Sequence, residues 1–475
     1  MKRSHLKYLL WLLPLLAVAG WFACCGGRHN YVEYLPTDAR LVARVDVQTL
    51  SDKGLLSLLP SSQRWHIDDL QEAGLRTDVP AYVFATAEGG FGLLASMKSA
   101  RRFEAWLREK GFDVESQRGL KWYGGGKWLL AFDRRKLMVM DCVLTSDANT
   151  ARRQLADLMK EKHSPSMHLT QVEGEPGAVA VSASLDMLPS AWREPLAKLL
   201  SFENELHSTR FVADLSFGEN DINLDARLCD VSAETKAHID DLLGLLRPIN
   251  GALLNVGPSR PAAWICANLD GESLLPFLRK DIKLRLLLLA LNFCVDADEI
   301  IRSVNGDVSL HLSKASTEIK ECCLAAQLKN EYFLQNAPQW GRGSLLSSVF
   351  RFSALGPRDF ILRGDDTAFC FGAHDGLLYL APSEELSAEV LRRNESPIAP
   401  RQDVEGRLLY ASFDAARWIE KYHLDDYVGA SFPSLLGLTN GLQRVSVALG
   451  EEQHVALKFV FDRPINELMK NSTER

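Results

Sequence analysis

The stretch Leu41-Val42-Ala43-Arg44-Val45-Asp46 decides the fold of this chain, because it is one of four copies of the same sequence pattern. Each copy is an apolar strand that ends in an aspartate and is followed by a helical pattern. The first and third aspartates are 224 residues apart, and the second and fourth are 228 apart. The regular spacing predicts an internal repeat. The other three copies are Val179 to Asp186, Ala263 to Asp270 and Leu408 to Asp414.

Hairpins and helices lie between these copies in matching order. The hairpin Trp128 to Met140 corresponds to Thr367 to Ala381, whose Asp375-Gly376 is a strong type I′ turn signal. The other matches are the helices Asn149–Lys160 and Glu384–Arg393, the hairpins Ser208–Leu228 and Arg444–Asp462, the hairpins Tyr82–Met97 and Asp307–Leu328, the helix Ala100–Lys110 with a shorter helix near Glu331, and the helices from Ser232 and Pro464.

These matches predict a tandem duplication of a unit of roughly 220 residues, which is a usual domain size. A chain of 475 residues also exceeds the length at which single cores stop growing. The junction falls in a stretch rich in Pro, Gly and Asn, 248–261. We expect a signal or membrane anchor segment at 1–27 and two halves at 28–250 and 258–475. Short hairpins between strands predict an α+β fold, with mostly antiparallel sheet covered by helices on one face.

The N-terminus has the layout of a secretory signal, with basic residues before an uncharged apolar stretch at 8–25. At 1.5 Å per residue this stretch reaches roughly 27 Å, enough for an uncleaved transmembrane anchor. The alternative is a lipoprotein, cleaved after the small residue Ala23 and lipidated on Cys24. Either outcome, like simple signal cleavage, places the body outside the cytoplasm. A second apolar run, Leu286 to Val295, is too short to span a bilayer and is expected as a buried helix.

Composition excludes some partners. The net charge is −7 with both signs interspersed, so no field exists to gather a nucleic-acid backbone. The content of 47% hydrophobic and 24% charged residues is that of an ordinary globular protein. Beyond Cys24 and Cys25, seven cysteines lie in the body, mostly in apolar runs, where we expect them to act as small core residues.

The four aspartates of the repeated pattern are the first candidates for catalytic residues. Each stands where a strand passes into a helix, and there a carboxylate accepts hydrogen bonds from the first free N–H groups of the helix. A single active site would not need its acid repeated at this spacing. We therefore expect helix capping or turn formation at Asp46, Asp186, Asp270 and Asp414.

Other candidate sites have simpler structural explanations. Gly124-Gly125-Gly126-Lys127 lacks the spacing of a phosphate loop and predicts a hairpin turn. Asp296 begins an incomplete calcium-loop pattern and predicts a helix N-terminus. His374-Asp375 near Asp365-Asp366 suggests a divalent-ion site, but a solvated turn is favoured. The aromatic residues Trp122, Tyr123 and Trp128 suggest a binding surface or hairpin packing. The sequence assigns no catalytic residue, no metal ligand and no cofactor.

Three segments resemble a known family: Tyr34-Leu35-Pro36-Thr37-Asp38-Ala39, Val304-Asn305-Gly306-Asp307-Val308 and the hairpin Phe371 to Tyr379. The first is similar to the Y-[I/L]-P-x-D-A opening of an uncharacterised family of envelope proteins from Bacteroidota. Members carry a lipoprotein-like or anchor-like signal before this opening. The resemblance implies a compartment and a fold, and it carries over no catalytic residue.

These observations favour a non-catalytic cell-envelope protein, held at the membrane by its N-terminal segment, that binds a protein or glycan partner on the extracytoplasmic side. One alternative is an envelope hydrolase with a site between the two halves. Another is a periplasmic chaperone or inhibitor that acts through a sheet edge.

Overall fold

The structure is a computed structural model, and the chain forms two compact units. Described residues up to Lys236, with Asp426–Gly441 and those from Phe461 onward, belong to unit 1, and Ala237–Asp425 and Leu442–Val460 form unit 2. The predicted halves 28–250 and 258–475 divide the sequence, whereas these units divide the chain in space. The structure describes residues 30–55, 67–86, 90–117, 119–125, 128–141, 148–162, 167–188, 190, 193–194, 208–292, 295–316, 318, 321–340, 351–364, 368–431, 435–450 and 454–471.

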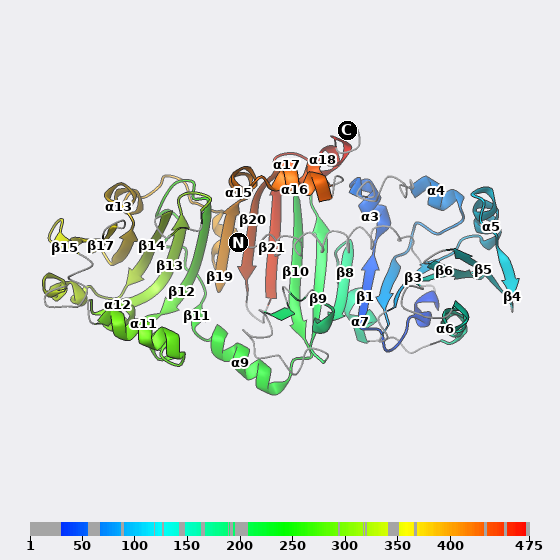
Figure 1. Ribbon diagram of the computed structural model, residues 1–475, viewed down its shortest axis with the longest axis horizontal. Helices are drawn as coiled ribbons and strands as arrows, with labels where there is room; N and C mark the ends of the chain where they lie inside the picture. The colour runs from blue at the N-terminus through cyan, green and yellow to red at the C-terminus, as the bar shows by residue number, and fades with distance from the viewer. Residues whose placement is uncertain are drawn as a thin grey trace. The chain divides into compact units, whose positions relative to one another are not determined.

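Unit 1 contains an antiparallel sheet (Figure 1). Across it, neighbouring strands follow the order β4, β5, β6, β7, β3, β2, β1, β8, β9 and β10. The strands are β1 (Leu41–Val45), β2 (Ala81–Ala85), β3 (Phe91–Ser96), β4 (Glu115–Gln117), β5 (Leu120–Gly125), β6 (Trp128–Phe132), β7 (Lys136–Asp141), β8 (Val179–Ser184), β9 (Arg210–Phe217) and β10 (Asp221–Cys229).

The sheet of unit 2 is also antiparallel. Its order is β15, β16, β17, β18, β14, β13, β12, β19 and β20, and the short β11 pairs with the end of β12. The strands of the second half are β11 (Leu246–Arg247), β12 (Ala263–Asp270), β13 (Val304–Leu312), β14 (Cys322–Leu328), β15 (Arg351–Ala354), β16 (Asp359–Arg363), β17 (Ala368–His374), β18 (Leu377–Ala381), β19 (Leu409–Asp414), β20 (Leu442–Leu449) and β21 (His454–Phe461).

Helices connect these strands. The α-helices are α3 (Val47–Asp52), α4 (Ile67–Glu72), α5 (Ala100–Glu109), α6 (Ala148–Lys160), α7 (Met167–Glu173), α9 (Ala233–Leu243), α10 (Gly271–Leu278), α11 (Ile282–Asn292), α12 (Ala297–Ser303), α13 (Glu384–Leu391), α14 (Arg401–Val404), α15 (Ala415–Tyr422), α16 (Leu424–Ser431), α17 (Leu436–Gly441) and α18 (Ile465–Asn471). Short 3₁₀ helices are η1 (Asn30–Tyr34), η4 (Leu185–Met187), η6 (Tyr332–Gln335) and η7 (Ala337–Gln339).

The two sheets share one topology, since β1 to β9 of unit 1 and β12 to β20 of unit 2 follow the same order of pairing. The predicted α+β fold with duplicated antiparallel sheets is therefore confirmed. The hairpin of β17 and β18 turns at Asp375 and Gly376, whose φ angles of 50° and 75° are those of the predicted type I′ turn. Local turn chemistry was enough to place this hairpin.

Three of the four predicted aspartate caps are present. Asp46 accepts a hydrogen bond from the Thr49 amide at 3.2 Å. Asp270 caps α10, with its carboxylate 3.1 Å from the Ser273 amide, and Asp414 caps α15 in the same way. Asp186 is not a cap but takes the other predicted role, because it lies inside the 3₁₀ turn η4, where it pairs with Arg40 at 3.1 Å.

Loss of a cap leaves amide groups at the helix N-terminus without their acceptor. We expect Asp270→Ala to lower the free energy of unfolding by about 1 kcal/mol, measured by urea denaturation. Asp270→Asn keeps an acceptor oxygen and should recover most of this loss. Equal stability of the alanine variant and the original chain would contradict the capping role.

One part of the core of unit 2 lies under the face of its sheet that carries Trp264 and Cys323. The segment 249–256 covers this face with Ile249, Leu253, Leu254 and Val256, all buried. Asp307 on β13 holds the segment, because its fully buried carboxylate accepts hydrogen bonds from the Asn250 and Ala252 amides, each at 3.0 Å. The stretch that the sequence marks as a junction is thus packed onto the sheet.

Candidate functional site

Several motifs from the sequence take structural roles. Asp296 is the N-cap of α12 and accepts from the Glu299 amide at 3.3 Å, which confirms the predicted helix start. Gly124 and Gly125 pair with Leu129 and Trp128 across β5 and β6, which confirms the predicted hairpin. Gly126 and Lys127 lie outside the described residues. Trp122 is buried, and Trp128 is exposed.

His374 belongs to a small polar cluster on β16, β17 and β18. Its Nε2 donates to Asp359 at 2.6 Å, and the Tyr379 hydroxyl donates to the same carboxylate oxygen at 2.7 Å. Burial and the neighbouring carboxylate raise the pKa of Tyr379, so its hydroxyl stays protonated at neutral pH. The cluster therefore ties three strands together and offers no activated nucleophile. Asp365 and Asp366 lie outside the described residues.

A serine and a histidine meet in unit 1. His168 Nδ1 lies 2.7 Å from the Ser182 hydroxyl, which itself donates to Gln171 at 2.7 Å. The single hydroxyl proton goes to Gln171, so the imidazole must donate to the serine and cannot act as its base. Burial, with a smaller effect of Arg210, lowers the pKa of His168 to about 4. This arrangement fixes α7 on β8.

Free cysteines follow the predicted core role only in part. Cys266, Cys323 and Cys370 are buried on the covered face of unit 2, as expected. Cys229 and Cys322 are half-buried, which corrects the expectation for these two. Cys322 and Cys323 point to opposite faces of β14, as strand alternation requires.

The other face of the unit 2 sheet is the most distinctive surface of the chain. Every cross-strand pair that β12 makes on this face with β13 or β19 joins two residues without hydrogen-bonding side chains. Figure 1 shows these strands side by side, with α11 and α12 toward one end and α15 toward the other. Its half-buried residues, the open apolar face, are Ile265, Ala267, Leu269, Leu310, Leu312, Leu409, Phe413, Val445, Val447 and Leu449.

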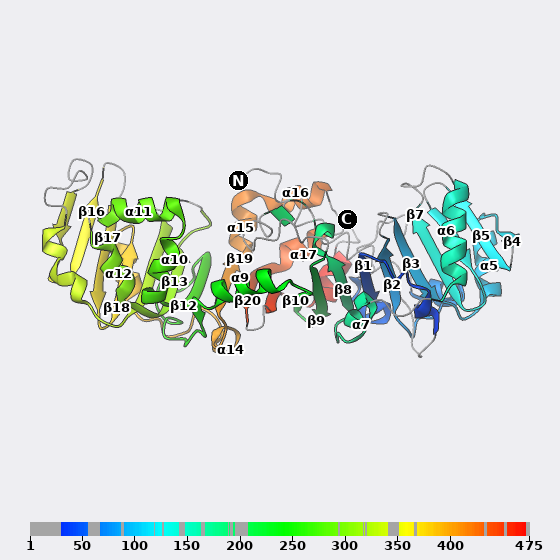
Figure 2. The same ribbon diagram turned by 90° about the horizontal axis from the view of Figure 1, so that it is seen from below.

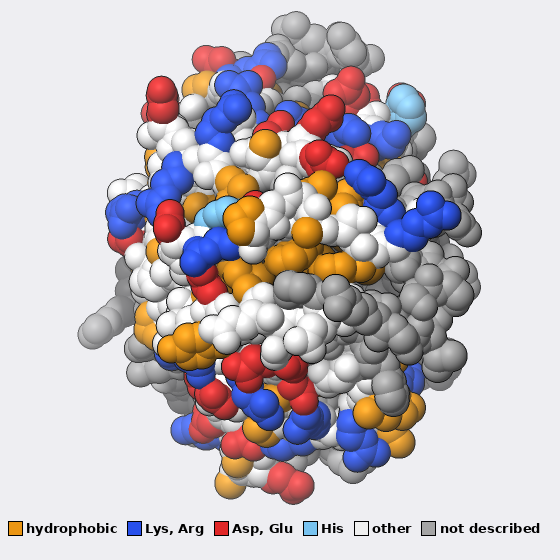
Figure 3. All heavy atoms as spheres, turned by 90° about the vertical axis from the view of Figure 1, so that its left-hand side faces the viewer, with side chains coloured by type: hydrophobic (Ala, Val, Ile, Leu, Met, Phe, Trp, Pro, Cys, Tyr) orange, Lys and Arg blue, Asp and Glu red, His pale blue; other side chains and the backbone are white. Residues whose placement is uncertain are grey.

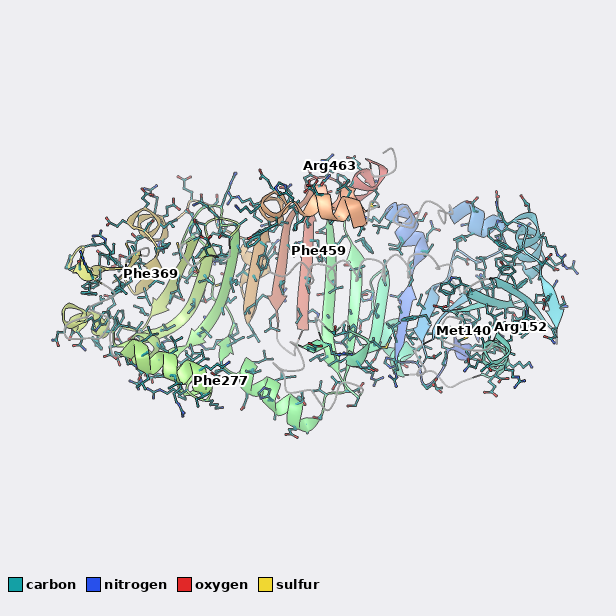
Figure 4. The ribbon with its side chains drawn as sticks, in the orientation of Figure 1. Met140, Arg152, Phe277, Phe369, Phe459 and Arg463 are labelled. Atoms are coloured by element: carbon teal, nitrogen blue, oxygen red, sulfur yellow. The ribbon has the colours of Figure 1, made fainter. Side chains whose placement is uncertain are left out.

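The neighbouring strand β21 extends the same pattern. Ala456 packs against the buried cluster of Trp264 and Tyr410. Residues an odd number of positions away point to the opposite side of the strand. Val455, Leu457 and Phe459 (Figure 4), all half-buried, are therefore on the apolar side.

Polar residues occupy the covered face. Asp307, Ser309 and His311 of β13 are completely buried there, and Asn268 of β12 is nearly so. Antiparallel sheets usually bury their apolar face and expose their polar one. Over these strands unit 2 buries these polar side chains beside Trp264, Cys266 and Tyr410 on the covered face. The aliphatic side chains of the other face are left partly in water, which indicates a binding surface.

The sheet of unit 1 has a similar arrangement of polar and apolar side chains. On β8, β9 and β10, one face carries buried Ser182, Arg210 and Asp214. Asp214 accepts from the Gly177 amide, and burial raises the pKa of its carboxyl. The opposite face carries half-buried apolar side chains, namely Val181, Phe211, Ala213, Leu224, Ala226 and Leu228.

Over β14, β16, β17 and β18, the apolar side of the unit 2 sheet is covered by a cluster of buried side chains. Phe333 of η6 and Trp340, which follows η7, pack on Phe360 and Phe371. Figure 3, which views the molecule from the end that carries β15, shows hydrophobic side chains gathered near the middle, with charged side chains above and below. The uncovered part of the face is thus confined to β12, β13, β19, β20 and β21.

The helix α11 corrects the expectation that the run Leu286 to Val295 is a buried helix. It lies at the margin of unit 2 beside α10 and α12 (Figure 2). Leu288 alone among its leucines is buried, whereas Leu286, Leu287 and Leu289 are 55–58% exposed. A run of leucines predicts burial in general, and only the packing around this helix reveals that its outer side meets solvent.

No group of three or more metal-ligating side chains occurs among the residues that the structure describes. Within the same residues, no helix is long and apolar enough to cross a membrane. The predicted signal or anchor at 1–27 and the lipidation candidate Cys24 lie outside the described residues.

Comparison with known proteins gives a family and weak structural likenesses. A model described as a domain of unknown function (DUF4836) matches residues 60–395. Crystal forms I and III of TP0453 resemble the chain with a TM-score of 0.30 and 12% identity, covering 46% of this chain and 86% and 87% of those chains. A DNA polymerase sliding clamp from Pseudomonas aeruginosa aligns at a TM-score of 0.10 and 10% identity, covering 95% and 96%. No curated protein matches.

Proposed function

We propose that this chain, which belongs to the family of domains of unknown function DUF4836, is a non-catalytic envelope protein that binds the acyl chains of lipids on its open apolar face. The observation that carries the proposal is the half-open aliphatic face of the unit 2 sheet, whose opposite face is already covered and buries Asp307, Ser309 and His311 beside the apolar core. Each methylene that such a face takes from water contributes about 0.8 kcal/mol.

The chemistry of the face favours an acyl chain over the glycan or protein partner expected from the sequence. A glycan needs hydrogen-bonding groups that fix its orientation. Protein interfaces also carry roughly one hydrogen bond per 100–200 Å². The side chains of the open apolar face offer neither donors nor acceptors, and an acyl chain requires none.

The two alternative functions find less support. The outer strands β4 and β15 are three and four residues long and carry Glu115 and Arg351, so they are poor templates for adding a strand. The Ser–His contacts of the described residues, at Ser182 and at Ser309, are buried and give no route for a hydrolase substrate.

The location is part of the proposal. The basic start and apolar stretch at 8–25 support a membrane-held chain, through a transmembrane segment or a lipid on Cys24, with the body extracytoplasmic. The Tyr34 to Ala39 opening supports an origin in a Bacteroidota envelope. A lipid-binding face suits a chain held at a bilayer.

Photolabelling tests the proposed ligand. The full chain in vesicles is irradiated with a fatty acid that carries a diazirine, and adducts are located by peptide mass spectrometry. We expect adducts on β12, β13, β19 and β20. The triple variant Val445→Thr, Val447→Thr, Val455→Thr keeps side-chain shape and should lower the yield there by at least about tenfold, because an unpartnered hydroxyl costs roughly 1–3 kcal/mol.

The matched control is Val231→Thr, a half-buried valine outside the face, which should label like the original chain. Circular dichroism verifies that the triple variant is folded. Labelling that is equal in the triple variant, or that is spread evenly over the chain, would contradict the assignment of the face.

A further inference from the structure

The outer side of α11 is apolar. At 100° per residue, Ile282, Leu286 and Leu289 lie on one side of the helix and Leu288 on the other. Ile282 is 60% exposed, and Leu288 makes the buried contact. Leu284, Leu287 and Leu291 are also at least 39% exposed, so most of the leucine surface of this helix is open to solvent.

Cations surround this apolar side. Lys283 and Arg285 are exposed and have no ion-pair partner among the described residues. Lys280 Nζ lies 5.8 Å from the ring centroid of Phe277, a residue that is labelled in Figure 4, and Lys280 comes just before the helix in the sequence. Asp281 accepts from the Lys283 and Leu284 amides, so this carboxylate serves the helix N-terminus. Leucines flanked by free cations are typical of helices that lie in the interface of an anionic bilayer.

We propose that α11 docks on a membrane surface that contains anionic lipids, with its leucines at the acyl boundary and Lys283 and Arg285 at the headgroups. A second copy of the chain fits less well, because a two-fold contact between α11 helices would bring their cations together. The inference goes beyond the proposed function, since a chain can dock without taking up a lipid.

Hydrogen exchange gives a local readout that the N-terminal segment does not disturb. The full chain is reconstituted into vesicles of phosphatidylcholine alone or with phosphatidylglycerol. Amides of 282–292 should exchange at least about fivefold more slowly on the anionic vesicles. The variant Leu286→Ser, Leu289→Ser should lose this protection, and Lys283→Gln, Arg285→Gln should remove the difference between the two lipids.

The matched control is Tyr332→Ser, which removes an exposed ring outside α11 and should leave the protection intact. Unchanged exchange in β12 shows that each variant is folded. Absence of protection on anionic vesicles overturns the proposal. The proposal is also overturned if the α11 amides of the detergent-solubilised chain exchange more slowly as the protein concentration rises. That result would mean that α11 contacts a second copy of the chain. Photolabelling of the open apolar face is unaffected by either outcome.

Discussion

Replacing Gly271 by alanine is expected to lower the free energy of unfolding of unit 2 by more than about 3 kcal/mol. Gly271 is the first residue of α10 and is buried. A Cβ at this position would lie 1.7 Å from the carbonyl oxygen of Ile301 and 3.1 Å from the Cα of Arg302. Both neighbours are backbone atoms, so relief requires α10 and α12 to move apart.

Urea denaturation followed by tryptophan fluorescence measures the effect. Gly450→Ala is the comparison in the same unit, because a Cβ there meets its nearest neighbours at an ordinary 3.6–3.7 Å. The comparison variant should remain within about 1 kcal/mol of the original chain. Since α11 packs beside α12, Gly271→Ala should also weaken the membrane protection of α11. A stable Gly271→Ala chain would show that the close approach of the two helices is not required.

Features set by a few adjacent residues were predictable from the sequence. The type I′ turn at Asp375-Gly376 and the caps at Asp46, Asp270 and Asp414 depend on local hydrogen bonds and φ angles, so the pattern alone locates them. Asp186 fits the same pattern but lies in a 3₁₀ turn near Arg40. Its partner is remote in sequence, and no local signal distinguishes this copy from the others.

The candidate site was not predictable, because alternation does not say which side of a strand is covered. On β12, Trp264 and Cys266 alternate with Ile265 and Ala267, and both sets are suited to burial. The Trp264 side is covered because Asp307, on the neighbouring strand, binds the amides of the segment 249–256. The segment also packs Ile249 and Leu254 against Trp264, so the buried carboxylate and this apolar packing together hold it on that side. The aliphatic side stays half-open. The exposure of α11 likewise depends on packing that its leucines do not encode.

Acid should destabilise the chain through His311, which lies under that same segment. The ring is completely buried, its Nε2 contacts the Ser309 hydroxyl at 2.9 Å, and its Nδ1 has no hydrogen-bond partner among the described residues. Burial lowers the pKa of His311 from the ordinary 6.5 to about 3. The unfolded chain therefore binds a proton near pH 6.5 that the folded chain rejects. Stability is complete above pH 6.5 and falls as the pH drops toward 3.

Between pH 8 and pH 4.5 this histidine alone should remove about 3 kcal/mol from the free energy of unfolding, since each unit of pKa difference is worth about 1.4 kcal/mol. His311→Gln has no titrating ring at this position. Between pH 8 and pH 4.5 its free energy of unfolding should therefore fall by about 3 kcal/mol less than that of the original chain. Lost packing makes the variant less stable than the original chain at pH 8. Urea denaturation of both chains at the two pH values isolates the charge effect from the packing effect. An equal acid loss in both chains would mean that the buried imidazole is not the group that couples stability to pH.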